Sequence, residues 1–209
     1  MTDLSRLTEA VVRGDREVAT ATTDGAIAEG LDPRTILDAM TAAMEEVGRG
    51  YQAGEVYVPE MLLSARAMKD AMALLEPRLV EAGVRPDLVA VIGTVKGDLH
   101  DIGKNLVGMM WRGANIAVVD LGTNVPPERF VEAVHEHRAD VVGISALLTT
   151  TMGGMADVVR ALRDAGLDQV RVLVGGAPLD EAFAAQIGAD GYAPDAAAAV
   201  AAARRLARG

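Results

Sequence analysis

The 209-residue sequence contains no cysteine. Disulfide bonds, thiolate nucleophiles and cysteine-ligated zinc or iron–sulfur sites are therefore excluded. Aromatic residues make up only 3% of the chain, and the formal net charge is −10. Proteins that bind nucleic acids stack bases on aromatic rings and hold phosphates with clustered lysine and arginine, so both figures argue against a nucleic-acid partner.

Long apolar runs are also lacking, because none approaches the roughly 18–20 residues that a membrane-spanning helix needs. Residues 1–9 are polar and include acidic side chains, which argues against a signal or transit peptide. Half of the residues are apolar and 24% are charged, which is the balance of a globular chain. We therefore expect a soluble, cytoplasmic protein without a membrane partner.

Residues 1–86 are predicted to form four helices, because apolar side chains recur at helical spacing and nothing resembles a strand. Asp15 is a suitable N-cap for the second helix, and the pair Asp32-Pro33 is typical of a helix start. Pro59 begins the fourth helix. Amphipathic helices of this length favour a four-helix bundle.

Glycine and proline residues predict where two of these helices end. Gly48, Gly50 and Gly54 are expected to interrupt the third helix. Pro77 is expected to mark the end of the fourth helix, because proline breaks a helix interior. Residues 77–87 would then connect the bundle to the rest of the chain.

Residues 87–209 follow a different pattern, in which apolar strands alternate with helices. The predicted strands cover residues 88–93, 116–120, 141–146, 170–174 and 191–193. Continuous runs rich in valine and isoleucine, separated by helices, are typical of a parallel sheet covered on both faces. The sequence therefore predicts an α/β protein: a helical bundle, then a Rossmann-like, five-stranded, doubly wound domain.

Ligands of open α/β sheets bind beyond the carboxyl ends of the strands. The loop after the first predicted strand, residues 93–105, contains neither GxGxxG nor GxxxxGK[ST], so dinucleotide and P-loop sites lack their signatures. It contains His100 instead, two residues after Asp98. His135 and His137 are two apart on a predicted helix and point to nearly opposite faces, which favours two solvated side chains.

Two roles remain open for His100 on this evidence: a loop histidine that caps a helix or binds a carbonyl, or a metal ligand. A zinc site made of protein ligands alone is short of donors here, since cysteine is absent and no second histidine is near. That favours a metal already held in a macrocycle. Lys104 and Glu55 are expected to be solvated surface side chains.

Residues 97–105, Gly-Asp-Leu-His-Asp-Ile-Gly-Lys-Asn, closely resemble the Asp-x-His-x-x-Gly signature of cobalamin-binding domains. Residues 145–147 and 175–176 are similar to its second and third parts, in the same order. Residues 54–61 and 65–69 resemble the helical cap of methyltransferase-type proteins. The chain thus resembles the corrinoid methyl-carrier proteins of methyltransferase systems, which are similar to the cobalamin-binding module of methionine synthase.

The resemblance implies a helical cap in residues 1–86, a cobalamin-binding domain in residues 87–209, and a role for each matching residue. His100 would be the axial cobalt ligand, and Asp98 would bind its second ring nitrogen and form the catalytic pair with it. Ser145 or Thr151 would extend this relay. The resemblance also implies cofactor contacts at Gly103, Leu147, Thr149, Gly175 and Gly176. Gly143, Gly175 and Gly176 would leave room for the nucleotide tail of the cofactor, and Thr149 would hydrogen-bond that tail. By themselves these glycines are more typical of tight turns, and the His100 motif is what favours the tail.

Three residues match cap positions that would lie over the corrin: Tyr51, Val58 and Met61. Tyr51 and Met61 suit the core of a bundle equally well, since methionine at helical spacing commonly fills a core. The cap would have to move to expose the methyl group, which predicts a hinge in residues 77–87.

The resemblance implies a component of a methyltransferase system rather than a complete enzyme. Its cofactor would be cobalamin or another corrinoid, cycling between cob(I)alamin and methylcobalamin. One partner would be a substrate-specific methyltransferase, and a second methyltransferase would pass the methyl group to tetrahydrofolate or a thiol. A reductive activation protein would be a third partner. The methyl donor, the acceptor and the oligomeric state stay open.

Other classes of function remain alternatives. The small subunit of an adenosylcobalamin-dependent mutase also contains the Asp-x-His-x-x-Gly domain, although the helical cap argues against it. A cobalamin-responsive regulator would need a DNA-reading module, which the sequence does not show. A flavodoxin-like interaction domain without a cofactor is the last alternative.

Overall fold

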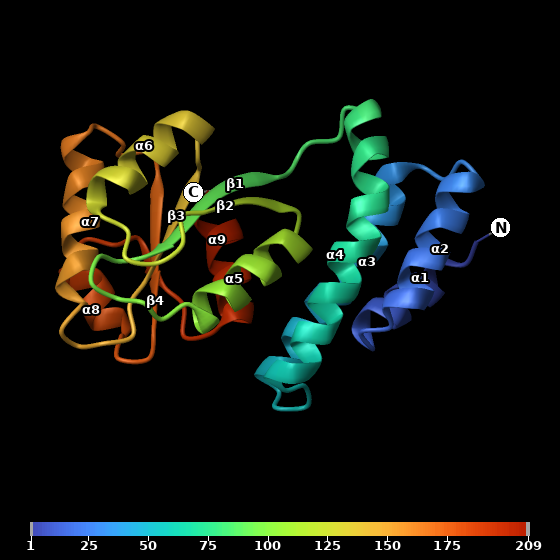
Figure 1. Ribbon diagram of the computed structural model, residues 1–209, viewed down its shortest axis with the longest axis horizontal. Helices are drawn as coiled ribbons and strands as arrows, with labels where there is room; N and C mark the ends of the chain where they lie inside the picture. The colour runs from blue at the N-terminus through green and yellow to red at the C-terminus, as the bar shows by residue number, and fades with distance from the viewer. Residues whose placement is uncertain (1, 208–209) are drawn as a thin grey trace. The chain divides into compact units, whose positions relative to one another are not determined.

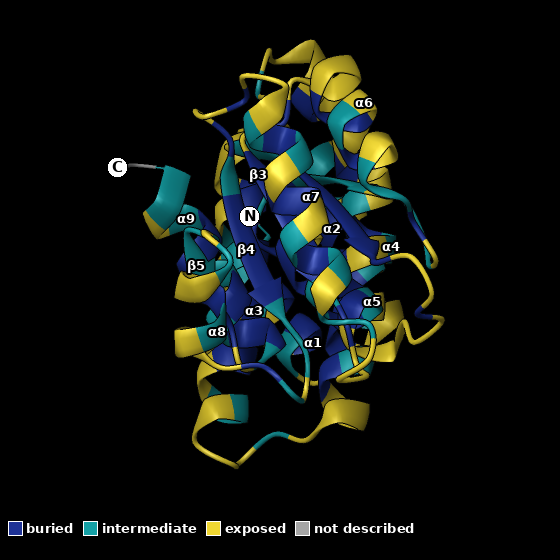
Figure 2. Cartoon of the chain, turned by 90° about the vertical axis from the view of Figure 1, so that its left-hand side faces the viewer, coloured by how far each residue is buried: buried dark blue, intermediate teal, exposed yellow. Residues whose placement is uncertain are grey.

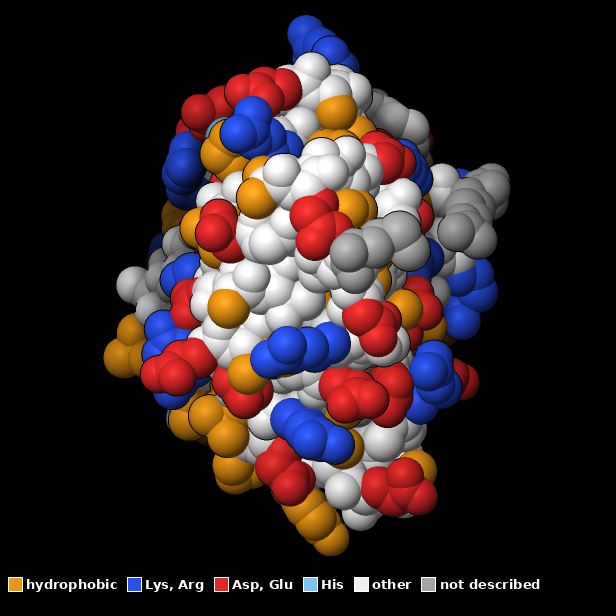
Figure 3. All heavy atoms as spheres, turned by 90° about the vertical axis from the view of Figure 1, so that its right-hand side faces the viewer, with side chains coloured by type: hydrophobic (Ala, Val, Ile, Leu, Met, Phe, Trp, Pro, Cys, Tyr) orange, Lys and Arg blue, Asp and Glu red, His pale blue; other side chains and the backbone are white. Residues whose placement is uncertain are grey.

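The computed structural model describes residues 2–207, which divide into two compact units (Figure 1). Among the described residues, the helical unit comprises 2–86 together with 112–115, and the sheet unit comprises 87–111 and 116–207. No helix in the described part of the chain is long and apolar enough to cross a membrane. On the face drawn in Figure 3, lysine and arginine side chains are interspersed with aspartate and glutamate.

The helical unit is built from four helices: α1 (Leu4–Val12), α2 (Arg16–Ala28), α3 (Pro33–Gln52) and α4 (Val58–Glu81). The side chains of Asp3, Asp15 and Asp32 accept hydrogen bonds from free backbone N–H groups in the first turns of α1, α2 and α3. Methionines fill much of the interior, and the buried ones are Met40, Met44, Met61 and Met68. Capping and methionine packing thus agree with the sequence pattern.

The third helix does not stop where the glycines predict. It continues through Gly48 and Gly50 to Gln52, and only Gly54 lies beyond its end, with φ +74°. A Cβ on Gly50 would approach Val56 to 2.7 Å, so this glycine allows the following loop to pack closely against the helix. The expected interruption at Gly48 and Gly50 is therefore wrong.

The predicted end of the fourth helix is also wrong, because Pro77 lies inside α4. Leu75 and Leu79 on either side of it are buried, and their packing outweighs the loss of one backbone hydrogen bond. The helix ends four residues later at Glu81, and Gly83, two residues beyond that end, has φ +70°. Its N–H donates to Val80 O, and the next N–H donates to Leu79 O, the pattern of a glycine C-cap.

The sheet unit contains five parallel strands in the order β2-β1-β3-β4-β5. The strands are β1 (Leu88–Thr94), β2 (Ile116–Asp120), β3 (Val141–Ser145), β4 (Arg171–Gly175) and β5 (Gly191–Tyr192). The helices are α5 (Ile102–Gly113), α6 (Pro127–His137), α7 (Gly153–Asp164), α8 (Glu181–Gln186) and α9 (Ala196–Ala207). The predicted doubly wound, Rossmann-like fold is confirmed.

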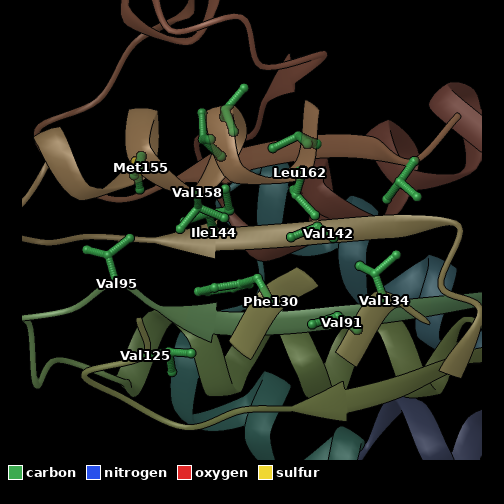
Figure 4. Close-up of a cluster of buried hydrophobic side chains, with 14 of the residues drawn as sticks. Val91, Val95, Val125, Phe130, Val134, Val142, Ile144, Met155, Val158 and Leu162 are labelled. Atoms are coloured by element: carbon green, nitrogen blue, oxygen red, sulfur yellow. The ribbon is translucent and has the colours of Figure 1, made fainter. Parts of the chain in front are cut away.

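Both faces of the sheet are covered, so its strands are largely buried (Figure 2). On one face, Phe130 of α6 and the apolar stripe of α7 pack against β1 and β3 (Figure 4). On the other face, the Trp111 ring of α5 lies against Gly143, and its Nε1–H donates to Ala199 O of α9 at 3.1 Å. Two-sided burial explains the continuous apolar runs in the strand sequences.

The strand order places β1 between β2 and β3, so the direction in which successive strands are added to the sheet reverses at β1. Thr94 pairs with Ser145 in the register of β1 and β3, and Ser145 pairs with Gly175 in that of β3 and β4. The carboxyl ends of these strands therefore lie side by side. This reversal point is where open α/β sheets bind their ligands.

Candidate cofactor site

The loop between β1 and α5 carries His100 at the carboxyl edge of the sheet. The Thr94 hydroxyl, at the end of β1, donates to His100 O at 3.0 Å. The Asp98 N–H donates to Val95 O at 3.1 Å, which folds the loop back on itself. Two residues after His100, helix α5 begins at Ile102. The histidine is thus held between a strand end and a helix start.

Asp98 and His100 are joined twice. The backbone N–H of His100 donates to Asp98 Oδ1 at 3.0 Å, and His100 Nδ1 lies 2.7 Å from the same oxygen. A carboxylate can only accept, so Nδ1 carries the proton, and in the neutral imidazole Nε2 keeps its lone pair. The His100 side chain is 49% exposed, and Nε2 has no hydrogen-bond partner within residues 2–207. This arrangement presents one nitrogen as a metal ligand.

The second carboxylate oxygen of Asp98 binds the loop that follows β3. The N–H of Leu147 donates to Asp98 Oδ2 at 2.8 Å, and the N–H of Leu148 lies 3.4 Å from it. The hydroxyl of Thr151 donates to the same oxygen at 2.7 Å. Asp98, which is fully buried, therefore links the His100 loop to a segment about fifty residues further along the chain.

These hydrogen bonds determine the charge of Asp98. Burial alone raises the pKa of this carboxyl group, because it disfavours the charged form. The N–H groups of Leu147 and His100, the Thr151 hydroxyl and the His100 ring all stabilise the carboxylate, and together they hold the pKa of Asp98 well below its usual range. Asp98 is therefore ionised at neutral pH and accepts from the His100 ring.

The structure brings Thr151, and not Ser145, against Asp98. The backbone carbonyl of Ser145 accepts from the Val95 N–H at 3.1 Å. The hydroxyl of Ser145 makes no hydrogen bond in the described residues, whereas the Thr151 hydroxyl donates to Asp98. Thr149 lies exposed in the same loop, and its binding to a nucleotide tail stays a prediction. Of the two relay residues that the sequence offered, Thr151 has the required contact.

The glycines near the site have different surroundings. Gly176 has φ +148°, and a Cβ on it would overlap the carbonyl oxygen of Ala146, so only glycine fits there. A Cβ on Gly175 would lie 3.1 Å from Ala193 O, whereas Gly103 has open space around it. A Cβ on Gly143 would meet Trp111 at 2.7 Å, which accounts for this glycine by packing rather than by a slot for a ligand.

Large apolar side chains lie at the surface in the two loops that Asp98 joins. Leu99 is 73% exposed and Ile102 is 81% exposed, one on each side of His100 in the chain, and Leu147 and Leu148 are each 42% exposed. Exposed apolar side chains beside a free ring nitrogen suit a large, flat, largely apolar ligand. The geometry therefore fits a metal macrocycle that takes one axial nitrogen from the protein.

Sequence reasoning missed Leu99, Ile102 and Leu148 as members of the site. The signal was present, because large apolar residues occupy a loop at a strand's carboxyl end, where polar residues are usual. Within residues 2–207, no group of three or more histidine or acidic side chains could hold a metal ion.

Lys104 differs from the expected surface side chain. It is buried in the first turn of α5, and its ammonium donates to both oxygens of Asp120, at 2.6 and 2.7 Å. Tertiary packing against the end of β2 accounts for the difference, and the spacing of residues within α5 does not reveal it. Glu55, His135 and His137 are exposed.

The three proposed cap residues belong to the helical unit. Met61 is fully buried in the described structure, Tyr51 is half-buried, and Val58 at the start of α4 is exposed. Met61 thus has the burial of a core methionine. Contact of these three residues with a corrin stays a prediction.

Comparisons with known proteins cover both units. A family model described as a B12 binding domain matches residues 88–201, and a second model with the same description matches residues 4–76. The chain is 39% identical to a corrinoid protein of Desulfitobacterium hafniense, over 99% of this chain and 98% of the relative. It is 40% identical to the dimethylamine corrinoid protein of Methanosarcina barkeri, over 97% and 96% of the two chains.

Solved structures have the same architecture. A chain in the crystal structure of the methanol:cobalamin methyltransferase complex of Methanosarcina barkeri superposes with a TM-score of 0.86 and 30% identity, over 99% of this chain and 80% of that chain. A cobalamin-binding protein from Desulfitobacterium hafniense superposes with a TM-score of 0.82 and 29% identity, over 99% of both chains.

Proposed function

The chain belongs to the corrinoid proteins built on the B12 binding domain, and from this premise we infer that it carries a methyl group on cobalt between methyltransferases. The observation that carries this inference is the Asp98–His100 pair, which leaves Nε2 free beside exposed apolar side chains. The relatives that match along nearly their whole length are named as corrinoid proteins, which supports the same function.

The residues around the site would divide the work of holding the cofactor. Bound cobalamin would supply a cobalt centre that accepts and gives up a methyl group. His100 Nε2 would be its protein ligand, and Asp98 would orient the ring and keep the proton on Nδ1. Leu99 and Ile102 would pack against the macrocycle.

The partners follow from the same family. A methyltransferase partner agrees with the methanol:cobalamin methyltransferase complex, to which this chain is similar. We propose that the donor enzyme acts on a methylated amine, because the dimethylamine and trimethylamine corrinoid proteins of Methanosarcina barkeri are 40% and 39% identical to this chain. A second methyltransferase and a reductive activation protein complete the proposal, in a cytoplasmic location.

The alternative functions are not favoured. The full-length relatives described above are methylamine corrinoid proteins and a corrinoid protein.

Each unit has a part in the proposal. Residues 87–209 would bind the cofactor. Residues 1–86 would act as the cap, with Tyr51, Val58 and Met61 over the corrin. The segment between the end of α4 and the start of β1, residues 82–87, would be the hinge.

The first experiment is a titration of the apoprotein with hydroxocobalamin, followed by visible absorption and by quenching of Trp111, the single tryptophan. We expect a stoichiometric complex whose reduced cobalt shows nitrogen hyperfine coupling from the protein. His100→Ala should lose that coupling, and His135→Ala, at an exposed position on α6, should retain it. Failure of the parent protein to bind hydroxocobalamin at micromolar concentrations would overturn the proposed function.

A further inference from the structure

Lys104 is the buried charge that the proposed function does not use. Its side chain is 2% exposed, and its ammonium has three acceptors: both oxygens of Asp120 and Asn105 Oδ1, the last at 2.7 Å. An ammonium has three N–H donors, so all of them are occupied. Lys104 therefore has no donor left for a ligand, and its role must be exerted through the residues that it holds.

The partners of Lys104 connect the end of β2 to the histidine loop. Asp120 is the last residue of β2, and its Oδ1 also accepts from the Gly122 N–H at 2.9 Å. On the other side, Asn105 Nδ2 donates to Asp101 Oδ2 at 3.0 Å, and the Asn105 N–H donates to Asp101 O at 2.7 Å. Asp101 directly follows His100, so a continuous chain of contacts runs from β2 to the metal-binding loop.

A second contact from the segment after β2 holds the other end of the same loop. Asn124 has φ +55°, and in this conformation its N–H donates to Asp98 O at 3.0 Å. Its side-chain Oδ1 accepts from the Gly97 N–H at 2.8 Å. The loop is therefore held on both sides of His100, by Asn124 before it and by Lys104 after it.

Burying the Lys104–Asp120 ion pair has a desolvation cost, so its role is not explained by stability alone. A buried ammonium loses its hydration, and a well-packed apolar side chain at the same place is often as stable or more stable. An apolar side chain would, however, lack the directional contacts that Lys104 makes with Asp120 and Asn105. What the ion pair adds is position, because it fixes the first turn of α5 relative to the end of β2.

We propose that Lys104 is a positioning residue for axial ligation: its ion pair with Asp120 fixes the backbone after His100 and so holds Nε2 ready for cobalt. This inference rests on the proposed function. Lys104 and Asp120 are not bonded to the His100 imidazole, so substituting them leaves the metal ligand in place. Their effect can therefore be measured apart from the loss of His100.

The test variant is the double substitution Lys104→Met/Asp120→Asn, which removes both charges and leaves no unpaired ion in the interior. The matched control is Arg163→Met/Asp190→Asn. Arg163 pairs with Asp190 at 3.0 Å next to the amino-terminal ends of β4 and β5, at the sheet edge opposite the site. The milder variant Asn105→Ala removes the side-chain contacts of Asn105 with Lys104 and Asp101 and keeps the backbone hydrogen bond to Asp101 O. It leaves no buried charge uncompensated, and it serves if the double variant does not fold.

Two kinds of readout decide the proposal: hydrogen exchange in the free protein, and hydroxocobalamin binding, measured as apparent affinity and as nitrogen hyperfine coupling. In the protein without cobalamin, amide hydrogen exchange of residues 100–105 should be about tenfold faster in the double variant, because the turn is no longer held. Its apparent affinity for hydroxocobalamin should fall about tenfold, as for other residues that orient a metal ligand. The reduced complex should show weaker nitrogen hyperfine coupling. Asn105→Ala should shift both readouts in the same direction by less, and the control variant should shift neither.

Unchanged exchange and unchanged coupling in a folded double variant would overturn the positioning role. Equal changes in the control variant would also overturn it, because they would show a general loss of stability. If the parent protein itself does not bind hydroxocobalamin, the proposed function fails instead. The exchange rates of the free protein would still show whether Lys104 holds the loop.

Discussion

The hydroxyl of Thr151 donates a 2.7 Å hydrogen bond to Asp98 Oδ2, across 53 residues of sequence. The other oxygen of the same carboxylate accepts from the His100 ring. A line of hydrogen bonds therefore runs from the loop after β3, through a buried carboxylate, to the exposed imidazole. The Thr151 oxygen also lies 2.9 Å from Leu148 O in its own loop, but a hydroxyl has one proton and the charged carboxylate of Asp98 is the stronger acceptor.

Substitution of Thr151 tests which hydroxyl supports Asp98. We expect Thr151→Val to lower the free energy of unfolding by about 2 kcal/mol, because the carboxylate loses a charge-assisted hydrogen bond. Thr151→Ser should stay close to the parent, since it keeps the hydroxyl. Ser145→Ala is the control and should change little, because that hydroxyl is not bonded to Asp98. Urea unfolding followed by Trp111 fluorescence measures all three, and a larger loss in Ser145→Ala would contradict the assignment.

Asp98→Asn should be more damaging than Thr151→Val. An asparagine presents an N–H₂ group to neighbouring donors, so at least one of the groups around Asp98 loses its acceptor inside the protein. We expect a loss of about 3 kcal/mol in the free energy of unfolding. We also expect weaker nitrogen hyperfine coupling from His100 in the reduced cobalamin complex. A variant with parental stability and parental coupling would show that the charge of Asp98 is not required.

The pH dependence of stability should also depend on Asp98. The pKa of Asp98 is lower in the folded protein than in the unfolded chain, where aspartate titrates near about 4. The carboxylate therefore stabilises the fold above about pH 4, and this contribution declines as the pH falls further. In urea unfolding at pH 7, 5, 4 and 3, the gap between parent and Asp98→Asn should be constant at first and narrow below about pH 4. A constant gap down to pH 3 would contradict the lowered pKa.

Two glycines that the resemblance grouped together should respond in opposite ways to alanine. Gly176→Ala places a Cβ against the Ala146 carbonyl at a positive φ, and we expect a loss of about 3 kcal/mol or failure to fold. Gly103→Ala fills open space in the first turn of α5, so it should leave the free energy of unfolding unchanged or raise it slightly. Thermal unfolding of the two variants is the measurement. Equal destabilisation by both would show that the backbone geometry does not separate them.

Cobalamin binding by Gly103→Ala tests whether Gly103 contacts the cofactor. A stable variant with weakened hydroxocobalamin binding would support the cofactor contact expected at Gly103. Parental affinity would argue that the position is only the start of a helix.

The sequence by itself determined the fold class and the central pair of the site. Strand and helix patterns are local, and two-sided burial leaves continuous apolar runs that no other arrangement of these segments explains. Asp98 and His100 are two residues apart, so their contact within one loop depends only on a short turn. For the same reason the N-caps at Asp15 and Asp32 were predictable.

Only the tertiary structure decided how distant segments complete the site. The choice of Thr151 over Ser145, the burial of Lys104 against Asp120, and the packing of Gly143 on Trp111 each depend on contacts between segments far apart in sequence. The position of Pro77 inside α4 also depends on tertiary packing, because burial of Leu75 and Leu79 outweighs the local tendency of proline to end a helix. Side-chain patterns encode which face a residue has within its own helix or strand. They do not encode which segment of the chain will lie against that face.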